Sequence, residues 1–163
     1  QSYCPIHQSE RMKFLFLTQY FPPETGAPQN RLMSLAKNII GQGHELEVLT
    51  AMPNYPKNEI FEGYRNKKRI VEEIEGIKVH RSSIYVSKKP GVVPRLKNYF
   101  SFVRSSIKEA RNMGDCDFVL VESPPLFLSW SAYSIAKKKK AKVIFNVSDL
   151  WPESAEKLDI VNN

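Results

Sequence analysis

Four short β-rich runs, separated by segments with helical periodicity, constrain the fold of this chain more than any other feature. The runs cover residues 13–18, 45–50, 117–121 and 142–147, and each ends in turn-forming residues. Strands that alternate with helices form a mostly parallel sheet with helices on both faces. The sequence therefore predicts an α/β, Rossmann-like fold in which the binding loops follow the carboxyl ends of the strands.

Three amphipathic segments supply the helices. The first, 28–43, has apolar residues at helical spacing and a glycine at its end, and the third starts after the prolines at 124 and 125 and runs to the lysines at 137–140. The second follows Pro94, and its expected core face comprises Leu96, Tyr99, Phe100, Val103, Ile107 and Ala110. Residues 69–83 alternate on both sides of Glu75 and Gly76, which predicts a hairpin or strand pair.

The loop after the first strand is the most unusual segment. It reads Y-F-P-P-E-T-G-A-P from Tyr20 to Pro28, and its prolines exclude both a helix and a central strand. Gly26 lets a bulky anionic ligand approach the backbone, and the helix that begins beside it presents unpaired N–H groups to a phosphate. A glycine needed only for a tight turn explains the residue equally well.

Four loops are expected to face one crevice at the carboxyl edge of the sheet: 20–27, 52–55, 122–125 and 148–153. Asp149 closes the last strand, and its carboxylate either caps the next helix or accepts hydrogen bonds from sugar hydroxyls or from an acceptor nucleophile. Glu24 and Glu122 have the same two interpretations.

The charge and the hydropathy of the chain limit the kinds of partner and the location that we expect. The formal net charge of +7 and a pI near 9.4 suit an anionic partner, although a solubilising surface accounts for them as well. No apolar run approaches the length of a membrane span, and the amino-terminal residues lack the order of a signal peptide, so a cytoplasmic protein is expected. Cys4 and Cys116 have no metal-binding spacing and are expected to be free thiols.

Familiar cofactor motifs are absent from the sequence. No G-x-G-x-x-G follows the first strand, and no Walker lysine motif occurs, so a standard dinucleotide or P-loop site is not supported. No metal-ligand cluster emerges, and no cofactor is expected.

Five motifs in order carry a family resemblance. They are Y-F-P-P-E-T-G-A-P at 20–28, G-H-E-L-E-V-L-T at 43–50, P-N-Y-P at 53–56, S-P-P-L-F-L at 123–128 and D-L-W-P-E-S at 149–154. Together they resemble the amino-terminal domain of retaining family 4 glycosyltransferases. The resemblance is closest to the bacterial enzymes that build O-antigen, capsule and exopolysaccharide, including N-acetyl-L-fucosamine transferases.

The resemblance implies one half of a GT-B enzyme, in which two Rossmann-like domains face each other across a cleft. Residues 1–11 show no periodicity before the strand that opens at Met12, so they are expected to be upstream or vector-derived sequence. The resemblance implies that 12–163 form the acceptor-side domain, with the donor-binding domain absent. The implied reaction moves a sugar from a nucleotide-sugar donor, a UDP-sugar by expectation, to a polyprenyl-diphosphate-linked acceptor. Asp149 is the catalytic candidate, where many members carry a histidine that contacts the donor sugar. The donor- or acceptor-binding candidates are Glu24, Thr25, Gly26, Asn54, Glu122, Ser123 and Glu153.

The resemblance also implies an acceptor held at the inner face of the cytoplasmic membrane. Residues 85–104 combine basic side chains with the apolar residues Val92 and Val93, a composition that suits peripheral contact with anionic lipid. An ordinary core helix with a charged outer face fits the pattern equally well. The membrane-facing candidates are Lys88, Lys89, Arg95, Lys97, Phe102 and Arg104.

Two other functions remain open on the sequence. One is a non-catalytic Rossmann module that binds a nucleotide or a partner protein. The other is nucleic-acid binding, suggested by the charge and by Tyr99 and Phe100, but these aromatics fall on the helix face expected to be core. Nucleic acid is therefore not expected as a partner.

Overall fold

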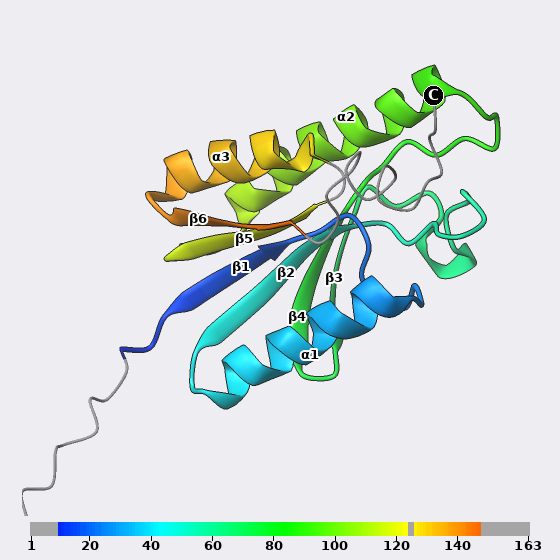
Figure 1. Cartoon of the computed structure of the whole chain (residues 1–163). Coiled ribbons are helices and arrows are strands. Elements are labelled where there is room, and N and C mark those ends of the chain that lie inside the picture. The colour runs from blue at the N-terminus through cyan, green and yellow to red at the C-terminus, as the bar shows by residue number, and fades with distance from the viewer. Residues whose placement is uncertain (1–9, 124–125, 148–163) are drawn as a thin grey trace, which may run out of the picture.

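The computed structural model describes residues 10–123 and 126–147 (Figure 1). The strands are β1 (Lys13–Leu17), β2 (Glu45–Ala51), β3 (Arg69–Ile74), β4 (Ile77–Ser82), β5 (Phe118–Ser123) and β6 (Lys142–Val147). The helices are α1 (Ala27–Gly41), α2 (Val92–Glu109) and α3 (Leu128–Lys139), and the short 3-10 helices are η1 (Glu62–Tyr64) and η2 (Ala110–Asn112).

The described strands form one sheet in the order β3-β4-β2-β1-β5-β6. All neighbouring strands are parallel except β3 and β4, which form the antiparallel hairpin expected around Glu75 and Gly76. From β1 the chain first adds β2 and β4 on one side and then returns to add β5 and β6 on the other. The strand order therefore reverses between β1 and β5, and such a switch point is where doubly wound sheets bind ligands.

Alternation along β1 explains the two-layered core. Phe16 points to one face of the sheet, where it packs with Leu32 and Ala36 of α1, while Leu15 and Leu17 point to the other face. That second face is covered by α2 and α3, so the helices lie on both sides of the sheet (Figure 1). The predicted mostly parallel, Rossmann-like α/β sheet is confirmed.

The buried face of α2 differs from the prediction. Val103 and Ala110 are buried as expected, but Phe100 is 45% exposed and Phe102 is completely buried. The packing against α3 decides the rotation of the helix, because the small side chains Ser106 and Ser131 meet there with their hydroxyl oxygens 2.7 Å apart. The expectation that Phe102 faces a membrane is therefore wrong, since this ring belongs to the core.

Candidate functional site

The carboxyl edge of the sheet gathers the loops that follow β1, β2 and β4, as the parallel topology requires. The loop after β4 was expected only as a membrane contact, and the structure adds it to this edge. The loop after β5 is described from residue 126 onward. The catalytic candidate Asp149 and the binding candidate Glu153 lie outside the described residues, so their assignments stay predictions.

Glu24 joins the first two loops from the inside. Its side chain is almost fully buried, and Oε1 accepts the backbone N–H groups of Asn54 and Tyr55 at 2.8 and 2.9 Å. Oε2 accepts the N–H of Phe21 at 3.2 Å. Burial raises the pKa of Glu24, although these three donors act in the opposite direction. The carboxylate thus fixes the loop after β1 against the loop after β2.

Asn54 has a similar inward position. Its side chain is buried, and Nδ2 donates to the carbonyl oxygen of Met52 at 2.9 Å. This bond holds the turn that presents the backbone N–H of Asn54 to Glu24. Glu24 and Asn54 were expected to bind the donor or the acceptor. In the structure their side chains are hydrogen-bonded to backbone groups of the loops and hold those loops in place.

The amino end of α1 lies beside these loops. Gly26 is the N-cap, no side chain caps the helix, and its first turn holds no acidic residue. Gly26 has an extended φ of 169°, so its backbone does not require glycine. A Cβ atom there would lie 2.5 Å from Oε1 of Gln29, so an added methyl group would displace the end of that side chain. The neighbouring Thr25 is exposed, so this uncapped helix end is open to an anion.

The switch point between β1 and β5 is spanned by a charged group. Glu122, on β5, is buried, and its Oε1 binds the guanidinium of Arg31, which α1 supplies from the other side of the switch point. Its Oε2 accepts a hydrogen bond from Nδ2 of Asn146 at 2.7 Å. Ser123 ends β5 directly after it. Glu122 therefore positions a half-exposed arginine near the amino end of α1, a residue that the sequence pattern did not single out.

Arg31 has a recognisable signal in hindsight. It lies one turn inside a helix that begins at a ligand-binding edge, and its side chain is 48% exposed despite the ion pair. A cation held there by a buried carboxylate suits recognition of a phosphate group.

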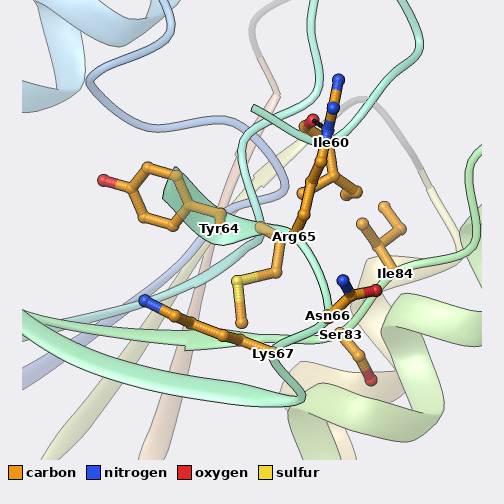
Figure 2. Close-up of a pocket in the computed structure, with 8 residues that line it drawn as sticks. Ile60, Tyr64, Arg65, Asn66, Lys67, Ser83 and Ile84 are labelled. Atoms are coloured by element: carbon orange, nitrogen blue, oxygen red, sulfur yellow. Dashed lines mark hydrogen bonds between the residues drawn. The ribbon is translucent and has the colours of Figure 1, made fainter. Parts of the chain in front are cut away.

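A pocket of about 210 Å³ lies beside η1, between the segment after β2 and the end of β4. In Figure 2, Ile60 and Ile84 lie on one side, while Tyr64 and Lys67 extend to the other. The guanidinium of Arg65 is already engaged, because it donates to the carbonyl of Ile60 and pairs with Glu59. The hydroxyl of Tyr64 is engaged as well, because it binds the carboxylate of Glu72.

A second hollow, of about 280 Å³, lies where the loops after β1, β2 and β4 meet the amino end of α2. We call it the tyrosine cleft because three tyrosine side chains contribute to its wall. Its lining residues are Tyr20, Tyr55, Asn58, Ser87, Lys89, Pro90, Gly91, Pro94, Arg95, Asn98 and Tyr99.

The basic residues expected to face a membrane lie in and after the loop that follows β4. Lys88 forms an ion pair with Glu59 at 3.0 Å, which lowers the pKa of that carboxyl. The remaining four cations of the set are exposed and have no ion pair within residues 10–123 and 126–147: Lys89, Arg95, Lys97 and Arg104.

Two features are absent from the described part of the chain. It contains no group of three or more histidine, cysteine, aspartate and glutamate side chains arranged to hold a metal ion. Among the helices described, none has the length and apolar character needed to cross a membrane.

The sheet order and the loops at its switch point define a doubly wound, Rossmann-like α/β domain. Two structures of the C-terminal domain of PF1911 hydrogenase from Pyrococcus furiosus share this fold, with TM-scores of 0.55 and 0.54. They are 13% and 14% identical in sequence, and each match covers 87% of this chain and 96% of the other. At this identity the likeness extends to the fold alone.

A curated relative stands closer in sequence. The chain is 29% identical over 140 residues to the protein named "Putative colanic acid biosynthesis glycosyl transferase WcaI" of Escherichia coli strain K12. The match covers 85% of this chain and 34% of the relative, so the chain spans about a third of that protein's length. No protein-family model matches the chain.

Proposed function

We propose that this chain is part of a glycosyltransferase that uses a nucleotide-sugar donor and a glycan acceptor in polysaccharide biosynthesis. The similarity to a protein named as a colanic acid glycosyl transferase supports this activity. The observation that carries the proposal is the site itself, where an uncapped helix amino end and the Glu122-bound Arg31 meet at the switch point of a doubly wound sheet. A nucleoside diphosphate has the charge that this place favours.

The finer assignment follows the five sequence motifs. The chain forms the acceptor-side domain of a retaining, GT-B enzyme, and a second domain supplies most donor contacts. The donor is a UDP-sugar and the acceptor a polyprenyl-diphosphate-linked saccharide, as in assembly of O-antigen or capsule at the inner face of the cytoplasmic membrane. Asp149 is the catalytic candidate of this reaction, and Ser123 and Glu153 are candidates for binding the donor or the acceptor.

Within the described residues the proposal gives each group a physical role. Glu24 and Asn54 hold the loops in place, Gly26 leaves room for the ligand, and Arg31 meets the negative charge that develops on the leaving diphosphate. A positive charge already oriented by Glu122 costs no reorganisation during the reaction. Binding in attack geometry and charge stabilisation are the two contributions that such a cleft makes.

The proposal includes peripheral contact with an anionic membrane. Val92 and Val93 are 72% and 62% exposed at the start of α2, and Lys97 and Arg104 are exposed on the same helix. Basic side chains gain about 1 kcal/mol each near an anionic lipid surface, and exposed apolar ones insert shallowly.

The test of the function uses the full-length protein that contains this chain. Transfer of radiolabelled sugar from a panel of UDP- and GDP-sugars to lipid-linked acceptors is measured for the wild type and for Arg31→Gln. We expect Arg31→Gln to lower kcat/KM roughly 100-fold, as removal of an electrostatic stabiliser does, while the matched variant Arg111→Gln leaves it unchanged. Nucleotide binding without transfer to any acceptor would instead support a non-catalytic Rossmann module.

A further inference from the structure

The tyrosine cleft has aromatic walls that are held in place. The rings of Tyr20 and Tyr55 meet edge to face, with their centroids 5.8 Å apart and their planes at 63°. Tyr55 remains 47% exposed, so part of its ring stays open to a ligand. Aromatic rings with one open side combine an apolar surface with a polar hydroxyl, which suits the mixed surface of a sugar ring.

Buried polar contacts fix the wall from behind. Gln19 is almost completely buried, and its Nε2 donates to Oδ1 of Asn98 at 2.8 Å and to the hydroxyl oxygen of Tyr20 at 3.2 Å. Asn98 in turn donates to the carbonyl oxygen of Tyr85 at 2.6 Å. Burial raises the pKa of Tyr20 to about 12, so its hydroxyl keeps its proton at neutral pH and has that proton to offer to a ligand.

Positive charge enters the cleft from two directions. Lys89 comes from the loop after β4, and Arg95 comes from the first turns of α2. Neither forms an ion pair with the described carboxylates. The amino end of α2 adds to this field, because Gly91 provides no side-chain cap and the first turn contains no acidic residue.

We propose that the tyrosine cleft binds a saccharide that carries a negatively charged group, with its ring against the tyrosines and its charge on Arg95 and Lys89. The shared chemistry is a sugar bearing a carboxylate or a phosphate. The cleft lies at the start of α2, and Arg31 is not among its lining residues. We therefore assign this saccharide to the acceptor, and that assignment rests on the proposed function. The binding itself follows from the cleft alone.

The test measures equilibrium binding to the full-length protein by NMR titration. The probes are methyl glucuronide, methyl glucoside, glucose 6-phosphate and inorganic phosphate. We expect both charged sugars, or one of them, to bind more tightly than methyl glucoside, and Arg95→Gln to weaken the charged sugars roughly tenfold, as loss of a charge-assisted contact does. The control Arg111→Gln removes the same charge from an exposed position in η2, directly after α2 and outside the cleft lining, and should leave the affinity for these probes unchanged.

The outcomes are separable. Tighter binding of methyl glucuronide than of glucose 6-phosphate identifies a carboxylate as the recognised charge, and tighter binding of glucose 6-phosphate identifies a phosphate. Three results would each overturn the inference: equal binding of methyl glucoside and the charged sugars, equal effects of Arg95→Gln and Arg111→Gln, or binding of inorganic phosphate as tight as that of the tighter charged sugar. If the enzyme transfers sugar while Arg95→Gln leaves binding unaltered, only this inference fails. If the cleft binds charged sugars and no transfer occurs, only the proposed function fails.

Discussion

At the scale of single residues, Glu24 connects a sequence motif with loop geometry. Its buried carboxylate accepts hydrogen bonds from three backbone N–H groups and so fixes the loop after β1 against the loop after β2. Glu24→Gln keeps the size but turns an NH₂ group toward at least one N–H donor. We expect it to lower the free energy of unfolding by about 1–3 kcal/mol, measured by urea denaturation at pH 7. Glu73→Gln, on the exposed side of β3, serves as the control. Equal stability of the two variants would show that Glu24 does not hold the loops.

The same carboxyl makes a prediction about pH. Burial raises the pKa of Glu24 above its ordinary value of 4.5, so the folded state binds a proton more readily than the unfolded chain does. The part of its stability contribution that comes from this raised pKa is therefore complete below pH 4.5 and is lost as the pH rises through the folded-state pKa. The stability difference between the wild type and Glu24→Gln should shrink as the pH rises from about 4 to about 7. A difference that grows over this range would mean that the amide donors outweigh burial.

Substitution of Gly26 is expected to affect nucleotide-sugar affinity more than stability. Because its φ is extended, Gly26→Ala meets only the far end of the buried Gln29 side chain, and we expect a loss of about 1 kcal/mol or less in unfolding free energy. The added methyl group would nevertheless stand at the amino end of α1. Nucleotide-sugar affinity of the full-length protein, measured by calorimetry, should fall at least tenfold more than that of the control Gly63→Ala, whose Cβ would meet no neighbour. Unchanged affinity would remove Gly26 from the binding site.

At the scale of elements, Arg81 joins β4 to its surroundings. It is completely buried, its guanidinium donates to the carbonyl of Ala51 at 3.1 Å and to that of Pro22, and it pairs with Glu72. The ring of Tyr64 lies over the same group, 5.2 Å away. One side chain thus connects β4 with β2, β3 and the loop after β1.

Arg81→Met should cost about 3 kcal/mol of unfolding free energy, because it leaves carbonyls and a carboxylate without their buried donor. Lys78→Met, which removes an exposed ion pair with Glu47 from the same strand, should cost no more than about 1 kcal/mol. Chemical denaturation of both variants gives the comparison. Similar losses of unfolding free energy in the two variants would show that the contacts of Arg81 stabilise the fold no more than an exposed ion pair does.

The amino-terminal half of α2 carries the membrane proposal. We expect the full-length protein to co-sediment with vesicles containing anionic lipid at low salt, and less at high salt. Val92→Asp combined with Val93→Asp should reduce sedimentation several-fold, whereas Val71→Asp, at an exposed apolar position of β3, should not. Binding that ignores lipid charge would contradict the proposal and favour an ordinary charged outer helix face.

How far the sequence predicted these elements depends on the range of the forces involved. Strand runs, the hairpin at Glu75 and the helix after Gly26 follow from local periodicity, so they were predicted closely. The rotation of α2 was not, because Phe100 and Phe102 are equally apolar and the choice between them depends on packing against segments distant in the sequence, such as the contact of Ser106 with Ser131. The loops after β1 and β2 were placed correctly at the carboxyl edge, but the inward turn of Glu24 depends on N–H groups about 30 residues away.

At the scale of the whole molecule, the switch point explains why the site residues meet. Gly26 and Arg31 come from the connection after β1, whereas Glu122 comes from β5, more than 90 residues later. The two segments become neighbours only because the sheet grows outward from β1 in both directions. The tyrosine cleft lies on the side where α2 begins, so one edge of the sheet carries two sets of positive groups. This arrangement suits a reaction between two anionic substrates.

The last prediction concerns activity of the 163-residue chain by itself. The proposed transfer needs donor and acceptor held together while positive groups meet the charge on the leaving diphosphate, and the chain matches only 34% of its relative's length. We therefore expect the chain alone to bind UDP and UDP-sugars weakly in calorimetry and to transfer no sugar. The full-length protein is expected to bind these nucleotides more tightly and to transfer the sugar. The tyrosine cleft should keep its affinity for charged sugars in either form, because its lining lies within the described residues. Turnover by the chain alone that matches the full-length protein would place the whole chemistry in these residues and would contradict the division between an acceptor-side and a donor-side domain.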